Sequence, residues 1–105
     1  DFYMLGWGVP TLDSHYVFAY LLDAAGSWNA AGYNNARVNE LTAAMATEID
    51  LNKRTAMINE AWTLVQADMP YVPIHHQVLA WGLASTVDIP IAADDAFRPR
   101  YAVMQ

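Results

Sequence analysis

The 105-residue sequence contains no cysteine, and this absence removes several kinds of chemistry at once. Disulfide bonds, thiolate metal sites and a cysteine nucleophile are all excluded. The sequence also has no Gly-x-Ser-x-Gly, no phosphate-binding glycine loop and no His-Glu-x-x-His motif. Asp13, Ser14 and His15 are adjacent, but adjacent residues cannot adopt the geometry of a catalytic triad. We therefore expect a protein that is not an enzyme.

Basic residues are scarce as well. Only 5 Lys and Arg stand against 11 Asp and Glu, which gives a formal net charge of −6 at pH 7. Because a negative chain is repelled by phosphate backbones and by anionic lipid, we expect neither nucleic acid nor an anionic membrane surface as a partner. No run reaches about 18 consecutive apolar residues, so the sequence predicts no membrane-spanning helix.

Apolar residues, in contrast, are abundant. Hydrophobic residues make up 55% of the sequence and the mean hydropathy is +0.11, which is rich for a single domain of this size. Part of that surface is expected to pack against something outside the chain. Asp1 also leads directly into an apolar run, without an initiator Met, a capping turn or a polar tail. We therefore expect residues 1–105 to be one domain that is a fragment of a larger protein.

The segment Trp7-Gly8-Val9-Pro10 is the main candidate for ligand binding. It follows an apolar run over residues 2–5 that is predicted to be a strand, and it precedes a predicted helix. Gly6 and Gly8 let another molecule approach the main chain closely. An indole at the carboxyl end of a strand lies where open α/β folds usually bind ligands. The alternative is a tight turn with a buried Trp7.

Three helices are predicted from apolar residues at three- and four-residue spacing. They cover residues 14–24, 35–49 and 51–69, with Asp13 or Ser14, Asn34 or Asn35, and Asp50 as candidate caps. Their predicted buried faces contain Tyr16, Val17, Tyr20 and Leu21; Val38, Leu41, Met45 and Ile49; and Ile58, Ala61, Trp62, Val65 and Met69. The short connection between the second and third helices predicts an antiparallel hairpin. Asp50 and Arg54, one turn apart, predict a cap and a surface ion pair.

Three further strands are predicted, at residues 71–83, 87–91 and 97–104. Because side chains alternate along a strand, the first has two faces. The predicted core face contains Val72, Ile74, His76, Val78 and Ala80. The expected fold class is α+β with an α/β-like character, a helical hairpin packed on a few strands.

His75 and His76 are the most tempting metal ligands. Neighbouring residues on a strand point to opposite faces, so the pair cannot chelate one ion without help from His15 or a distant carboxylate. We expect His75 to line a cleft and His76 to be a hydrogen-bonded core histidine. Neither a metal nor a cofactor is expected.

Several short motifs occur in an order typical of one family. They are Gly6-Trp7, an acidic loop with a short helix, Asn29, Tyr33-Asn34, an aliphatic helix, Asp50-x-x-x-Arg54, Ala61 and Asp68-x-Pro70-x-x-Pro73-Ile74. Together they resemble the carboxyl-terminal third of the family 5 extracellular solute-binding proteins, the peptide, dipeptide, nickel and glutathione receptors of ABC importers. The resemblance covers roughly residues 1–80, and residues 81–105 would form a segment that returns to the first lobe.

This resemblance implies a fragment of a two-lobed periplasmic binding protein that holds a peptide or peptide-like solute between its lobes. The implied partners are that solute, the membrane permease of the transporter and the remainder of the parent chain. The implied location is periplasmic or extracellular, membrane-associated through the transporter. Trp7, Gly8, Val9, Pro10 and His75 would be the ligand-binding residues. Peptide-binding relatives place an Asp three residues after the Trp to hold the ligand's ammonium group, and Pro10 cannot supply that charge.

Two other classes of function remain open. A metal or tetrapyrrole carrier of the same fold would use His75. A protein-docking module would present its aromatic residues as one patch, made of Trp28, Tyr33 and Trp62.

Overall fold

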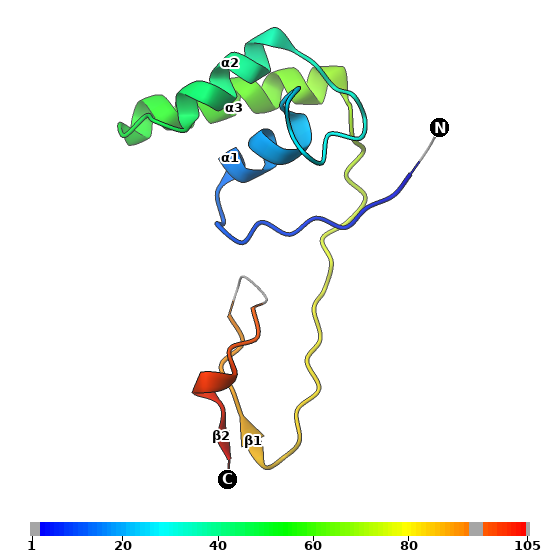
Figure 1. The fold of residues 1–105 in the computed structure, drawn as a ribbon, viewed down its shortest axis with the longest axis vertical. Helices are drawn as coiled ribbons and strands as arrows, with labels where there is room; N and C mark the ends of the chain where they lie inside the picture. The colour runs from blue at the N-terminus through cyan, green and yellow to red at the C-terminus, as the bar shows by residue number, and fades with distance from the viewer. Residues whose placement is uncertain (1–2, 93–95, 105) are drawn as a thin grey trace. The chain divides into compact units, whose positions relative to one another are not determined.

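The computed structural model describes residues 3–92 and 96–104. The chain divides into two compact units, one made of residues 13–73 and the other of residues 1–12 with 74–105 (Figure 1). We refer to them as the helical unit and the mixed unit. In the described part of the chain, no helix is long and apolar enough to cross a membrane.

The helical unit contains α1 (Ser14–Val17), η1 (Phe18–Leu22), α2 (Ala36–Met45) and α3 (Leu51–Asp68). Three of these segments begin at a polar side chain that accepts hydrogen bonds from backbone N–H groups of the first turn. Asp13 caps α1, Asn35 caps α2 and Asp50 caps α3. The capping predictions are confirmed, because caps depend on residues next to each other in sequence.

The predicted helical hairpin is confirmed as well. Helices α2 and α3 lie side by side and are joined by residues 46–50 (Figure 1). Their buried side chains are Val38, Leu41, Thr42 and Met45 of α2 and Ala61 and Val65 of α3. Ile49 and Met69 were predicted to be buried, which is wrong: they are 93% and 54% exposed. Each lies beyond the last turn of its helix, and Met69 takes a left-handed φ of 46°.

The first helix differs most from its prediction. The N–H of Asp23 donates to the carbonyl of Phe18 at 2.7 Å, five residues back, so η1 is a π-helical turn. The wider turn changes which side chains face inward, and Phe18, Leu21 and Leu22 become the buried residues. Of the predicted stripe, Leu21 is buried, Tyr16 and Val17 are partly buried, and the prediction is wrong for Tyr20, which is 41% exposed.

Gly26 marks where the following loop passes close to η1. A Cβ at Gly26 would lie 2.6 Å from the carbonyl oxygen of Tyr20, which already accepts a hydrogen bond from the N–H of Trp28. Gly26→Ala is therefore expected to lower the free energy of unfolding by about 1–3 kcal/mol, because backbone must move. Gly82→Ala is the control, since a Cβ there meets nothing within 4 Å. Equal denaturation midpoints for the two variants would contradict this.

Within the helical unit, the hairpin packs against η1. The rings of Phe18 and Trp62 lie 4.7 Å apart, and the indole N–H of Trp62 donates to the hydroxyl of Ser14 at 3.3 Å. Contacts between η1 and α2 complete the core of this unit. The chain therefore closes its helical core with its own first helical segment.

The mixed unit contains a two-stranded antiparallel sheet, β1 (Val87–Asp88) with β2 (Val103–Met104), and the 3₁₀ turn η2 (Pro99–Tyr101). Val87 pairs with Met104. The strands predicted at residues 87–91 and 97–104 are thus present only as two-residue pieces. Helices together with a small sheet make the fold α+β, as expected in general terms.

The two other predicted strands are not present. Residues 3–5 and 71–83 form no strand, and Phe2 lies outside the described residues. The predicted core face is also wrong, since Val72, Ile74 and Val78 are 70%, 66% and 83% exposed. A strand needs a hydrogen-bonded neighbour, and the described part of the chain supplies none for these segments. The sequence pattern alone could not reveal this.

Candidate functional site

The segment from Trp7 to Pro10 forms an open loop in the mixed unit. Trp7 and Val9 are partly buried, whereas Gly8 and Pro10 are exposed. The loop closes with a turn in which the N–H of Leu12 donates to the carbonyl of Val9 at 3.0 Å. The indole nitrogen of Trp7 is itself buried. The loop therefore exposes the main chain at Gly8 and Pro10, beside the partly buried ring of Trp7.

Gly6 and Gly8 are not required by the conformation of the described chain. A Cβ added at either position would meet nothing within 4 Å. Neither glycine has a left-handed φ. Among the described glycines, a left-handed φ occurs at Gly32. One use of glycine that does not depend on φ is to let another molecule approach the backbone closely. The ligand-binding interpretation of the loop stays a prediction.

His75 belongs to the same unit as the loop. It is exposed, and its Nε2 lies 3.3 Å from the Oε1 of Gln77. His76 is also exposed, so its prediction as a core histidine is wrong, because the strand that would have buried it does not form.

No metal centre is present among the described residues. No group of three or more His, Asp or Glu side chains in residues 3–92 and 96–104 is placed to hold an ion. His15 lies in α1 of the helical unit, and its backbone N–H donates to Asp13 at 2.8 Å.

The three aromatic residues considered as a docking patch have different surroundings. Trp28 is 63% exposed. Trp62 packs its ring on Phe18 inside the helical unit. Tyr33 is partly buried and donates its hydroxyl to Asp68. A single exposed aromatic patch made of these residues is therefore not formed.

Arg54 makes the main ion pair of the helical unit, but with Asp13 rather than Asp50. Its two terminal nitrogens donate to the two carboxylate oxygens of Asp13 at 2.8 and 2.9 Å. Its Nε donates to the carbonyl of Met45 at 3.2 Å, near the end of α2. The predicted Asp50–Arg54 pair is thus wrong, because the Asp50 carboxylate accepts the capping N–H groups of α3.

The ion pair between Asp13 and Arg54 also shifts the pKa of both side chains. The hydrogen bonds from Arg54 lower the pKa of Asp13 and, reciprocally, raise the pKa of Arg54. The side chains are 22% and 37% exposed, so solvent weakens the attraction only in part. Asp13 follows Pro10 by three residues, so the chain is fixed to the hairpin shortly after the candidate loop. Sequence reasoning missed the pairing because it joins residues 41 positions apart.

A second network fixes the loop before α2. The side chain of Asn29 bonds the backbone of Tyr33 in both directions, at 2.7 and 3.0 Å. The hydroxyl of Tyr33 donates to Asp68 at 2.7 Å, and the amide of Asn35 donates to the same oxygen at 2.9 Å. These contacts tie the loop to the end of α3 and lower the pKa of Asp68.

Tyr33→Phe is expected to remove one part of this network with a measurable pH signature. Burial first, and then the bond to Asp68, raise the pKa of Tyr33 to about 12. Stability from the neutral phenol is therefore present below about pH 10, the unfolded value, and is lost as the pH rises toward 12. The variant should be less stable at pH 7 by about 1 kcal/mol. It should also lose part of the alkaline dependence of its unfolding midpoint, and an unchanged alkaline profile would contradict this.

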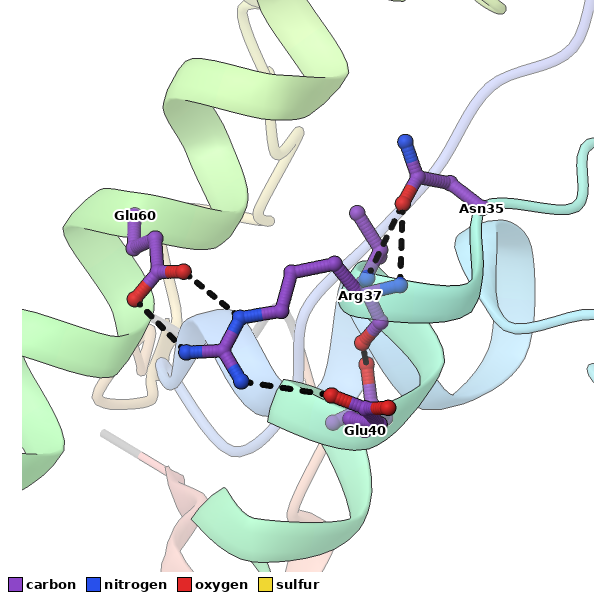
Figure 2. A network of polar contacts seen from close by, with 6 residues as sticks. Asn35, Arg37, Glu40 and Glu60 are labelled. Carbon is purple, nitrogen blue, oxygen red and sulfur yellow. Dashed lines mark hydrogen bonds and ion pairs between the residues drawn. The ribbon is translucent and has the colours of Figure 1, made fainter.

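Arg37 is the centre of an exposed polar cluster. Its guanidinium donates to Glu60 of α3 at 2.7 and 3.1 Å and to Glu40 of α2 at 3.2 Å, beside the Asn35 cap (Figure 2). All three charged side chains are about half exposed or more, between 47% and 68%. Such pairs contribute little to stability, so we interpret this cluster as a solvated face that joins the two helices.

The mixed unit has a small apolar cavity near its sheet. The rings of Trp81 and Phe97 stack at 5.9 Å beside Ile89, which is buried. The cavity has room for about one water molecule. It is therefore packing space and not a solute site.

Comparison of the chain with protein-family models, with curated proteins and with solved structures found no match.

Proposed function

We propose that this chain is the carboxyl-terminal part of the substrate-binding component of an ABC importer, and that residues 7–10 form one wall of the cleft for a peptide or peptide-like solute. The observation that carries this proposal is the open surroundings of Gly6 and Gly8. Glycines that the described chain does not need for its own conformation are best explained by a ligand that lies against their backbone.

The residues on which the resemblance rests also support the proposal, because several of them contact one another. Asn29, Tyr33 and Asp68 form one network, and Arg54 pairs with the acidic residue after the candidate loop. Ala61 is fully buried in the hairpin. The residues on which the resemblance rests thus have structural roles in the helical unit that are consistent with the proposal.

The proposed mechanism is binding without catalysis. Trp7 would stack on a peptide plane or another flat group of the solute, and the exposed main chain at Gly8 would supply hydrogen bonds. Pro10 offers no charge, so the charged ends of the solute would be held by the remainder of the parent chain. Closure of two lobes follows when the solute contacts both and so stabilises the closed state.

The test compares two similar glycines in the full-length parent. Gly8→Ala is expected to weaken solute binding at least about tenfold, because a methyl group would keep the solute away from the backbone. Gly82→Ala is the matched control, since it also places a Cβ in open space but lies outside the candidate loop. Binding would be measured by calorimetry with the peptide that co-purifies with the parent. Equal affinity in both variants would refute the role of the loop.

A further inference from the structure

Leu12 has an unusual backbone conformation for its residue type. Its φ is 54°, and within residues 3–92 and 96–104 the residues other than glycine that have a positive φ are Leu12 and Met69. A Cβ crowds the following carbonyl oxygen in this left-handed region, so glycine or asparagine is the usual residue there. Leucine at position 12 therefore costs free energy that glycine would not cost.

The side chain of Leu12 gains little burial in return. It is 72% exposed, although a leucine contributes to stability chiefly by leaving water. A single exposed leucine is ordinary on a protein surface, but an exposed leucine on a strained backbone combines two unfavourable features. Backbone strain of this kind clusters at ligand-binding and active sites. Leu12 is therefore a candidate for a functional contact.

Leu12 also belongs to the turn that closes the candidate loop. Both lie in the mixed unit, and the N–H of Leu12 donates to the carbonyl of Val9 at 3.0 Å. Pro10, within this turn, is exposed as well. The sequence has no charged residue between Asp1 and Asp13. The side chains that residues 7–12 can offer to a ligand are therefore uncharged.

We propose that Leu12 is a specificity-determining residue of the candidate loop, and that its exposed isobutyl group contacts an apolar side chain of a peptide solute. This inference rests on the proposed function and narrows the solute class to peptides with an apolar side chain. The left-handed φ and the bond to Val9 hold Leu12 in one backbone conformation before the solute arrives. A contact that is ordered in advance loses less entropy when the ligand binds.

Trileucine and trialanine are the probes, and their binding to the full-length parent would be measured by calorimetry. We expect the parent to bind trileucine at least about tenfold more tightly than trialanine, because a larger apolar side chain is buried. Leu12→Asn removes the apolar contact but keeps a residue that tolerates the left-handed region. It should weaken trileucine binding at least about fivefold and trialanine binding less than about twofold.

The stability of the unliganded parent separates a solute contact from a structural role. Because Asn fits the left-handed φ better than Leu does, Leu12→Asn should have a urea midpoint equal to or above that of the unchanged parent. If Leu12 packed against the remainder of the parent chain instead, the variant would have a lower midpoint. A lower midpoint would therefore overturn the inference.

Met69→Asn is the matched control. Met69 also has a left-handed φ, 46°, and is 54% exposed, but it lies at the end of α3 and outside the candidate loop. Met69→Asn should leave the affinity for both peptides unchanged. A loss of trileucine binding equal to that of Leu12→Asn would overturn the specific role of Leu12.

Gly8→Ala distinguishes this inference from the proposed function. If Gly8→Ala weakens the binding of both peptides while Leu12→Asn leaves the ratio of their dissociation constants unchanged, the loop remains the binding site and the role of Leu12 is overturned. If Gly8→Ala leaves both affinities unchanged, the loop is overturned and Leu12 with it. A parent that binds trileucine no more tightly than trialanine would also overturn the inference.

Discussion

Phe18→Ala is expected to unfold the helical unit or to leave it close to unfolding at 25 °C. Phe18 is fully buried in η1 and packs its ring on Trp62 of α3, so the change leaves a cavity between η1 and the hairpin. Removing a fully buried Phe costs about 3–5 kcal/mol. Whole domains are stable by only about 5–15 kcal/mol, and small ones lie toward the lower end.

The matched control is Leu51→Ala, which also removes apolar volume but from a residue that is 78% exposed. Its expected effect is within about 0.5 kcal/mol. Urea denaturation followed by the far-ultraviolet signal would compare the two variants. A Phe18→Ala midpoint close to that of Leu51→Ala would contradict the placement of Phe18 as the centre of this core.

Breaking the Asp13–Arg54 pair is expected to have the next largest effect. Asp13→Asn keeps a good capping side chain but removes the charge, and Arg54→Met keeps an apolar stem of similar length. Because Asp13 is 37% exposed, the full value of a charged hydrogen bond must be reduced for solvent screening. We expect each single change to lower the free energy of unfolding by about 1–2 kcal/mol.

A double-mutant cycle isolates the pair. The coupling between Asp13 and Arg54 is expected to be about 1 kcal/mol, and additive effects of the two changes would contradict their contact. The pH dependence has a defined sign. Because Arg54 lowers the pKa of Asp13, the pair stabilises the fold above the unfolded value of 3.8 and this contribution is lost as the pH falls through the lowered value. Arg54→Met should therefore reduce the acid sensitivity of unfolding.

Local features of this fold could be predicted from sequence, and features that depend on distant partners could not. The caps at Asp13, Asn35 and Asp50 and the end of α3 before Pro70 depend on neighbouring residues, so they were predicted correctly. The π-helical turn after Phe18 was missed, because apolar spacing assumes a regular helix. Because of this turn, Phe18 and Leu22 are buried, whereas the regular spacing had predicted a buried face with Tyr16 and Tyr20.

The strand predictions failed for a different reason. The sequence of residues 71–83 is compatible with a strand whose side chains alternate between two faces. Such a pattern shows only which side chains would share a face once the segment has paired with another strand. The described chain provides no partner strand there. The Asp13–Arg54 pair was likewise invisible, since nothing local distinguishes Asp13 from Asp50 as the partner of Arg54. The ligand-binding assignment of residues 7–10 remains a prediction that rests on the open glycines.

The central proposal is tested most directly by native mass spectrometry of the full-length parent, purified from its own compartment without refolding. We expect the parent to retain a mass that corresponds to a short peptide or a peptide-like solute. Exchange of that mass should be faster in the Trp7→Ala variant than in the parent. A protein that carries no solute, or only a metal ion, would contradict the assignment of this chain to solute binding for an importer.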